Sequence, residues 1–266
     1  MEERRERGEA AVGANRALLG ESPAAGAVGR PLEPLEIRLY RSRAEYLEDP
    51  ADGGALPWSS GYYSPNEGIS RFYSESGKGA ADALGRDLHE VVAHELTHHY
   101  VDRRWVPFDA RTATQPGFWL VEGFAEHVSE QALEMRRRGG AMDDPTVRAL
   151  DITAAVARMG RLLPLSTLLS MTHEKFETGL EGAVGVVKLR HTLGAIELDR
   201  RGLFYAQSGA LTYFVLHRCG DAGRATCLGW LADYYRGRRI VDWSEPLGFN
   251  DLAAFEKAFL AFLAGI

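Results

Sequence analysis

The sequence predicts an α+β fold in which a small β-rich N-terminal lobe precedes a larger, mostly helical lobe. Two runs rich in β-forming aromatic residues flank a turn at residues 64–68, and from Asp82 onward apolar residues recur at helical spacing. A chain of 266 residues with 45% hydrophobic content is long enough to bury a core without disulfides. We expect the β-rich part at about residues 35–80 and the helical part at about residues 82–266.

The first 34 residues are rich in Glu, Arg, Ala, Gly and Pro, a composition that predicts a flexible tail or linker. Residues 35–266 are expected to form a single domain. Its first segment, "LEIRLYRSRAEYLE", predicts a short strand and then a helix. The next, "SSGYYSPNEGISRFYSE", predicts a hairpin that turns at Ser64-Pro65-Asn66-Glu67-Gly68.

Helices are expected through the rest of the chain. The first begins at Asp82 and ends near Arg103, and the second begins with Pro116 in its first turn and ends at Gly139-Gly140. Asn250 is expected to cap the last helix. Four further segments have helical spacing: "LLPLSTLLSMTHEKFE", "LFYAQSGALTYFVLHR", "ATCLGWLADYYRG" and "NDLAAFEKAFLAFLAG".

The charge and hydropathy of the chain argue against nucleic acid as a partner and against a membrane span. A net charge of −6 provides no basic field for nucleic acid, and no run of 18 apolar residues encodes a membrane span. The N-terminus lacks the apolar stretch of a signal peptide. The compartment stays open between a protein that remains inside the cell and an exported bacterial one whose signal is absent from this chain. The sequence does not indicate an oligomeric state.

The two cysteines, Cys219 and Cys227, lie eight residues apart, which suits neither a zinc ribbon nor a redox motif. Two interpretations stay open. In an exported protein they would form a disulfide between two helix ends, and otherwise they are small buried residues.

A possible metal site begins with His94-Glu95-Leu96-Thr97-His98, which is an HExxH pattern. Residues four apart share one face of a helix, so His94 and His98 can direct imidazole nitrogens at one ion. The carboxylate of Glu95 can then reach a water beside the metal without being a ligand, as a general base must. Taken alone, the pattern also fits a solvated polar helix.

A third ligand is predicted from "GFWLVEGFAEHVSE", where Glu122 stands among apolar residues. A carboxylate in such surroundings is costly unless it is paired or bound to a metal. Because catalytic zinc takes three protein ligands and keeps one open position, we expect one Zn²⁺ on His94, His98 and Glu122. Glu126, one turn further on, is expected to accept a hydrogen bond from the outer nitrogen of a liganding histidine; the alternative is a helix-surface carboxylate.

Other polar residues near the pattern have simpler interpretations. His89, His99 and His127 do not share the ligand face, so each is expected to be a polar or packed helix residue. Asp102 lies four residues after His98, and two alternatives stay open for it. It either supports a ligand by hydrogen bonding or is a surface carboxylate.

Together, "HELTH" and "WLVEGFAEH" resemble the gluzincin metallopeptidases, in which a Glu on a second helix follows HExxH. "HELTHHYVD" is similar to the thermolysin motif, and "WLVEGFAEH" resembles a helix of the aminopeptidase N group. The best match over length is to the peptidase MA-like domains of uncharacterised bacterial proteins, over roughly residues 35–265. The resemblance implies a zincin-like fold with HExxH on the active-site helix, and hydrolysis of peptide bonds by a zinc-activated water with Glu95 as general base.

Two departures refine this expectation. The aminopeptidase N group carries Gly-x-Met-Glu-Asn upstream, but the region here reads "GYYSPNEGISRFY", which favours an endopeptidase. The interval from His98 to Glu122 is longer than in thermolysin-like enzymes, and we assign the extra length to the loop "WVPFDARTATQPG". The hairpin near "GISRFYSE" is expected to offer an edge strand to an extended peptide.

The resemblance also implies a Tyr or His that stabilises the oxyanion. Tyr205 is the expected residue, with Tyr213, His191 and His217 as competitors. In each case the alternative is a packed side chain whose polar tip has a partner.

Two non-catalytic functions remain as alternatives. A silent zinc-binding pseudo-peptidase would act as a peptide- or protein-binding module, but Glu95 has no purpose in merely holding zinc. A structural zinc domain would prefer four ligands and cysteines, and neither cysteine is near the HExxH pattern. The sequence therefore favours a zinc metallopeptidase with a peptide or protein substrate.

Overall fold

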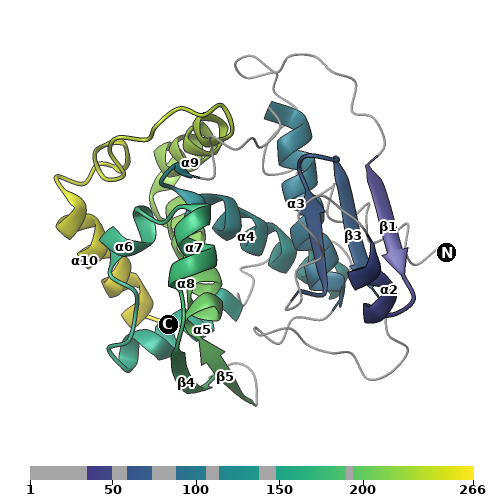
Figure 1. Cartoon of the computed structure of the whole chain (residues 1–266). Helices are drawn as coiled ribbons and strands as arrows, with labels where there is room; N and C mark the ends of the chain where they lie inside the picture. Colours follow the sequence, from purple (N-terminus) through teal and green to yellow (C-terminus); the bar gives the residue numbers. More distant parts are fainter. Residues whose placement is uncertain (1–34, 50–58, 74–87, 106–113, 138–147, 190–193) are drawn as a thin grey trace. The chain divides into compact units, whose positions relative to one another are not determined.

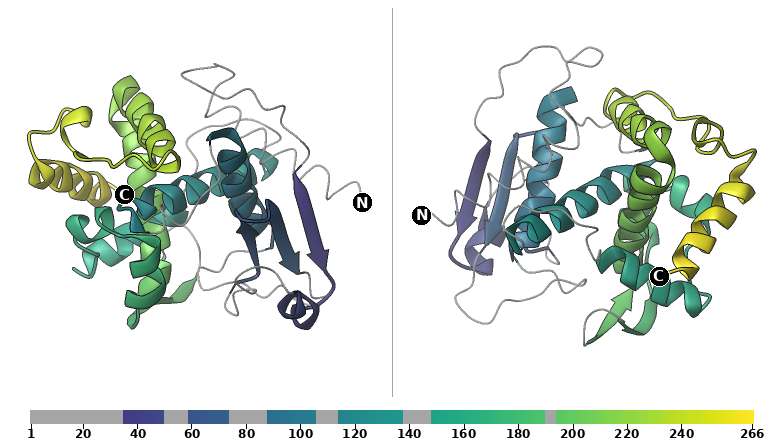
Figure 2. Two further views of the ribbon diagram at one scale, coloured as in Figure 1. Left: turned by 45° about the horizontal axis from the view of Figure 1, so that its top comes forward. Right: turned by 180° about the vertical axis from the view of Figure 1, so that it is seen from behind.

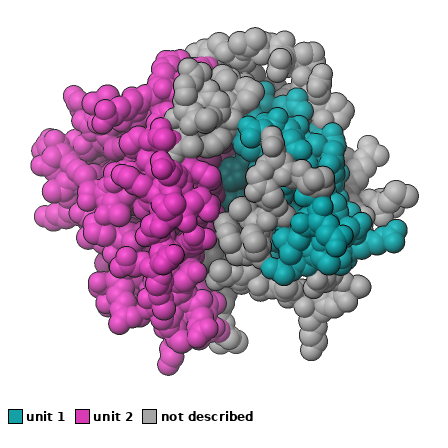
Figure 3. Space-filling model, viewed as in Figure 1, with its two compact units in different colours: residues 1–109, 128–145 teal, residues 110–127, 146–266 magenta. Residues whose placement is uncertain are grey.

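The computed structural model describes residues 35–49, 59–73, 88–105, 114–137, 148–189 and 194–266 (Figure 1). The fold is mixed α+β, as predicted. The chain divides into two compact units: unit 1 comprises residues 1–109 and 128–145, and unit 2 comprises residues 110–127 and 146–266 (Figure 3). The predicted tail, residues 1–34, lies outside the described residues.

Unit 1 contains a three-stranded sheet with the order β1-β3-β2, in which β1 runs parallel and β2 antiparallel to β3. The strand followed by a helix and the hairpin are both confirmed. The Ser42 hydroxyl caps α2 by accepting from the Glu45 amide at 3.2 Å, which explains where this helix begins. The elements are β1 (Glu36–Tyr40), α2 (Arg43–Glu48), β2 (Gly61–Ser64) and β3 (Ile69–Tyr73).

The hairpin turn ends at Gly68, whose φ of 67° favours glycine and whose amide donates to the Ser64 carbonyl at 2.8 Å. Because β3 pairs with β1 on one side and β2 on the other, it is the central strand. The hairpin near "GISRFYSE" therefore presents β2 as an edge strand, whereas β3 is interior. Binding of an extended peptide at that edge stays a prediction. The edges of this sheet are β1 and β2.

Helix α3 (Leu88–Trp105) packs against β2 and β3 (Figures 1 and 2). It extends two residues beyond the predicted end at Arg103, and the predicted start at Asp82 lies outside the described part of the chain. Its apolar face is buried, which explains the helical spacing in the sequence. The buried apolar residues on this helix are Val91, Ala93, Leu96, Tyr100 and Val101.

Helix α4 (Phe118–Arg137) begins two residues after Pro116, so that proline is not in its first turn. Gly117, with a φ of 108°, makes the bend before the helix, and the amides of Gly117 and Phe118 both donate to the Met171 carbonyl at 3.1 Å. The predicted end at Gly139-Gly140 lies outside the described residues.

Helix α8 is central to unit 2, because it packs against α5, α9 and α10 (Figure 2). The segment "LLPLSTLLSMTHEKFE" forms two short helices instead of one, and Thr172 caps the second. Asp251 rather than Asn250 caps the last helix, accepting from the Ala254 amide at 2.7 Å. The helices are α5 (Arg148–Arg158), α6 (Leu165–Leu169), α7 (His173–Gly179), α8 (Arg200–Arg218), α9 (Gly220–Tyr235), the 3₁₀ turn η2 (Glu245–Leu247) and α10 (Leu252–Ala264).

Unit 2 also contains an antiparallel pair of strands that the sequence patterns did not predict, β4 (Ala183–Lys188) and β5 (Ala195–Asp199). An irregularity between Ala183 and Gly185 shifts the register of this pair. The shift interrupts the alternation of side chains that identifies a strand, and Val186 is 58% exposed.

Both cysteines are free thiols, so the disulfide alternative is wrong. The alternative of small buried residues holds for Cys227, whereas Cys219 is only partly buried. Cys227 is fully buried inside α9, and Cys219 lies at the junction of α8 and α9. Burial raises the pKa of the Cys219 thiol to about 11. Among the described helices, none combines the length and the apolar character needed to cross a bilayer.

Candidate metal centre

Two histidines on α3 meet as the HExxH spacing predicts. His94 is buried and His98 partly buried, and their Nε2 atoms lie 3.1 Å apart. Nitrogens bound about 2.0–2.1 Å from a tetrahedral zinc are about 3.3 Å apart, so the spacing matches that of two ligands of one ion. The ring planes are inclined at 79°, so the two rings approach edge to face instead of stacking.

Glu122 on α4 offers a third atom that can bind a metal. One ligand atom from each of His94, His98 and Glu122 lies within 4.8 Å of the others, so this group could hold a metal ion. Glu122 is only 6% exposed, as the apolar surroundings in the sequence predicted. Burial raises the pKa of the nearby Tyr234 phenol, and the charge of Glu122 raises it further.

Gly123, next to Glu122, allows α4 to approach α8 closely. A side chain at this position would collide with the Ser208 carbonyl oxygen and the Thr212 hydroxyl of α8. Glycine is therefore required by the packing of two helices, and this packing fixes the part of α4 that carries Glu122.

Glu95 is partly exposed, and its Oε2 accepts a hydrogen bond from the backbone amide of Tyr63 on β2 at 2.8 Å. Sequence reasoning missed this contact because the donor is a main-chain group, which leaves no side-chain pattern to read. This hydrogen bond fixes the position of Oε2 and directs the Glu95 side chain towards the edge of the sheet.

Tyr63 makes two more contacts with α3. Its hydroxyl donates to Oδ2 of Asp102 at 2.6 Å, and its ring stacks on His99 with centroids 4.6 Å apart. Asp102 is 4% exposed, so the surface-carboxylate alternative is wrong for it. Its support of a liganding histidine stays a prediction.

His99 is a buried, packed histidine, as predicted. Its Nδ1 lies 3.0 Å from the Ser70 hydroxyl of β3. Burial first, and then the charge of Arg103, lower the pKa of His99 to about 4, so its ring is neutral at pH 7. The residue ties α3 to the sheet beneath it.

Glu126 is 3% exposed, so it is not a helix-surface carboxylate. Its Cβ faces α8 so closely that a methyl group at Gly209 would come within 3.0 Å of it. The predicted hydrogen bond to a liganding histidine stays a prediction. His127 is fully buried, and its Nε2 lies 3.2 Å from Nε2 of His217, in agreement with its interpretation as a packed residue.

The expected oxyanion residues have different environments. Tyr205 is half-buried on α8, and its ring and that of Phe176 meet edge to face with their centroids 5.4 Å apart. Tyr213 is buried, with its ring 4.6 Å from that of His217, so it has the packed environment of the alternative interpretation. His191 lies outside the described residues. The role of Tyr205 stays a prediction.

No protein-family model matches the chain, and no curated protein matches it. Two imidazoles and a carboxylate converge, and a further carboxylate stands beside them on α3. This is the donor set that a divalent transition metal prefers, with a proton acceptor next to it.

Proposed function

We propose that the protein is a zinc-dependent metallopeptidase and, more specifically, an endopeptidase. The observation that carries this proposal is the convergence of His94, His98 and Glu122, whose ligand atoms lie within 4.8 Å of one another. Glu95 adds the base that a structural metal site would not need.

Zinc suits the donor set better than calcium or magnesium, which take mostly oxygen ligands. His94 and His98 would supply two neutral nitrogens and Glu122 one charged oxygen. When bound there, zinc would supply the Lewis acidity that polarises a peptide carbonyl and makes a water molecule acidic near neutral pH.

Glu95 has the chemistry for the proton transfers. Its carboxylate would take a proton from the attacking water while the water oxygen bonds to the carbonyl carbon. It would then return that proton to the amide nitrogen as the carbon–nitrogen bond breaks, which releases a carboxylic acid and an amine. The hydrogen bond from the Tyr63 amide to Oε2 limits the rotation of this carboxylate.

Endopeptidase activity is favoured by the sequence "GYYSPNEGISRFY", which lacks the Gly-x-Met-Glu-Asn motif that holds a substrate amino terminus in the aminopeptidase N group. The expected substrate is a peptide or unfolded protein segment. The Glu95 carboxylate argues against a silent binding module.

The test is digestion of a mixed peptide library with the zinc-loaded full chain, with cut positions read by mass spectrometry. Internal cuts that disappear in Glu95→Gln are the expected result, because the variant keeps all three proposed ligands and loses the base. Cuts confined to one terminus would replace the endopeptidase with an exopeptidase.

Metal content provides a readout that does not depend on activity. After dialysis, the wild-type chain and Glu95→Gln should both retain about one zinc per chain, and His98→Ala should retain none. Zinc binding without any cleavage would favour the pseudo-peptidase, and no zinc in the wild-type chain would overturn the proposal.

A further inference from the structure

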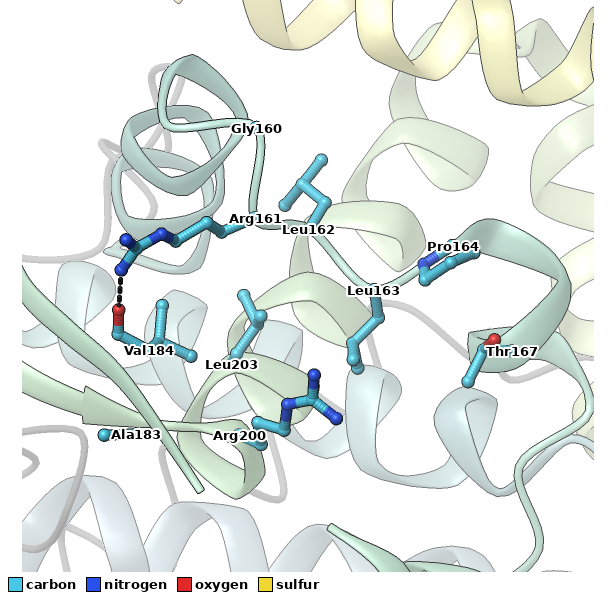
Figure 4. A pocket seen from close by; sticks show the side chains of 10 residues that line it. All are labelled: Gly160, Arg161, Leu162, Leu163, Pro164, Thr167, Ala183, Val184, Arg200 and Leu203. Atoms are coloured by element: carbon cyan, nitrogen blue, oxygen red, sulfur yellow. Dashed lines mark hydrogen bonds between the residues drawn. The ribbon is translucent and has the colours of Figure 1, made fainter. Parts of the chain in front are cut away.

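A cavity of about 510 Å³ opens in unit 2 where the connection between α5 and α6, the start of β4 and the start of α8 come together (Figure 4). Its volume lies in the range of sites for small molecules, about 300–1,000 Å³. None of its lining residues belongs to the candidate metal centre, so ligand binding in this cavity is independent of the proposed function.

The charge of the cavity lining is positive. Arg161 and Arg200 both line it, and no acidic residue does. In a chain whose net charge is −6, this local excess of two positive charges runs against the overall balance. An anion would therefore find a favourable potential in this cavity.

The position of Arg161 is fixed by the backbone around it. Gly160, with a φ of 65°, ends α5, and the Arg161 amide donates back to the Val156 carbonyl at 3.2 Å. The Arg161 guanidinium then donates through Nη1 to the Val184 carbonyl of β4 at 2.6 Å. One of its nitrogens is thereby satisfied, and the group is held at the cavity wall.

The guanidinium of Arg200 is available to a ligand. Arg200 is the first residue of α8 and is exposed, and its side chain makes no hydrogen bond or ion pair to any residue in the described part of the chain. Figure 4 shows this guanidinium beside the side chain of Leu163, on the opposite side of Leu203 from Arg161. A planar guanidinium without a partner binds a carboxylate with two parallel hydrogen bonds.

Apart from Thr167, the remaining side chains that line the cavity are apolar. Leu162, Leu163, Val184 and Leu203 line the cavity between and around the two arginines. A small inorganic anion would leave these walls in contact with water. A ligand with an apolar body of several carbons would cover them and gain about 25 cal/mol for each Å² that it buries.

We propose that this cavity binds a carboxylate attached to an apolar body, with Arg200 as the principal carboxylate-binding residue. Two sources have this chemistry: a free medium-chain fatty acid and the C-terminal carboxylate of an apolar peptide. In both, the carboxylate pairs with Arg200, Arg161 adds long-range attraction, and the carbon chain lies against the leucines.

The experiment is calorimetric titration of the full chain with decanoate, with decanol as the probe that lacks the charge. We expect decanoate to bind and decanol to bind at least ten-fold more weakly. Arg200→Gln should lower the affinity for decanoate by about ten-fold or more, because a charged hydrogen bond is lost. The matched control is Arg239→Gln, which removes an exposed arginine outside the cavity lining and should leave binding unchanged.

The peptide acetyl-Ala-Leu-Leu, as free acid and as amide, distinguishes a fatty acid from a peptide C-terminus as the natural ligand. It is added to the Glu95→Gln chain, so that cleavage cannot consume it. Binding of the free acid alone, lost in Arg200→Gln, supports a peptide C-terminus. Binding of decanoate but neither peptide supports a fatty acid. Failure of all these probes, or equal decanoate binding by wild type and Arg200→Gln, would overturn the proposal.

Discussion

The backbone amide of Tyr63 and Oε2 of Glu95 are 2.8 Å apart, and the same tyrosine holds Asp102 through its hydroxyl at 2.6 Å. One strand residue therefore contacts α3 at two points separated by seven positions of the helix. Its ring fills the interval by stacking on His99. As a result, β2 and the helix that carries His94 and His98 form one locally cross-linked element.

Replacing Tyr63 with Phe should destabilise unit 1 by about 1–3 kcal/mol, because the buried Asp102 carboxylate loses a hydrogen-bond donor. The measurement is urea unfolding followed by circular dichroism. The backbone amide remains in this variant, so peptidase activity of the folded protein should persist. The matched control is Tyr73→Phe on β3, because the Tyr73 hydroxyl has no hydrogen bond within the described residues. Its effect should stay within about 0.5 kcal/mol. Equal effects of the two changes would contradict the role of the Asp102 contact.

Replacing Gly123 with Ala should destabilise the protein by about 1–3 kcal/mol, because the new methyl group meets the Ser208 carbonyl, a backbone group that cannot rotate away. Helix propensity acts in the opposite direction, because alanine is the better helix former, so the measured loss is smaller than the packing cost itself. Gly229→Ala in α9 is the control, since a methyl group there meets nothing within 4 Å. That variant should gain up to about 1 kcal/mol. A gain in both variants would show that α4 and α8 tolerate a wider separation.

Removal of metal should lower the thermal midpoint, and added zinc should restore it. If zinc binds only the folded state, a free concentration 1,000 times Kd stabilises the protein by about 4 kcal/mol. Glu122→Gln should weaken zinc binding, because it replaces the proposed charged ligand with a neutral group of similar shape. Glu197→Gln, on the exposed face of β5, should bind as wild type does. The readouts are differential scanning calorimetry and metal content, and unchanged affinity in Glu122→Gln would remove that residue from the ligand set.

The sequence predicted the parts of the site that depend on local spacing. His94 and His98 meet because residues four apart share a helix face, and Glu122 was identified because a carboxylate is unusual between Val121 and Phe124. The contact between Tyr63 and Glu95 was missed, since it joins positions 32 apart through a main-chain donor. No residue type identifies such a donor in advance.

Element boundaries were harder to predict than the elements. Asn250 and Asp251 are both good caps, and only the backbone decides that Asp251 accepts from Ala254. Likewise, Thr172 divides an apolar segment of helical spacing into α6 and α7 by capping the second. The strands β4 and β5 were missed because the irregularity near Gly185 interrupts their alternation.

The free energy of unfolding should decrease as the pH is lowered below about 6.5, because of His127. Burial first, and then the charge of His217, lower the pKa of His127 in the folded protein from 6.5 to about 3. The unfolded chain then binds a proton that the folded chain does not bind, so the stabilising contribution is complete above pH 6.5. It is lost as the pH falls, at about 1.4 kcal/mol per pH unit from this residue.

Urea unfolding of wild type and His127→Gln between pH 7 and pH 4 measures this contribution. The difference in slope between the two proteins is the relevant quantity, because the substitution also changes packing at pH 7. We expect the free energy of unfolding of the variant to change less with pH, by about 1.4 kcal/mol per pH unit, which corresponds to one proton. NMR should show that the His127 ring is still neutral at pH 5. Parallel slopes would mean that His127 can take up a proton inside the fold, for example by separation of its ring from His217, which lies 3.2 Å away.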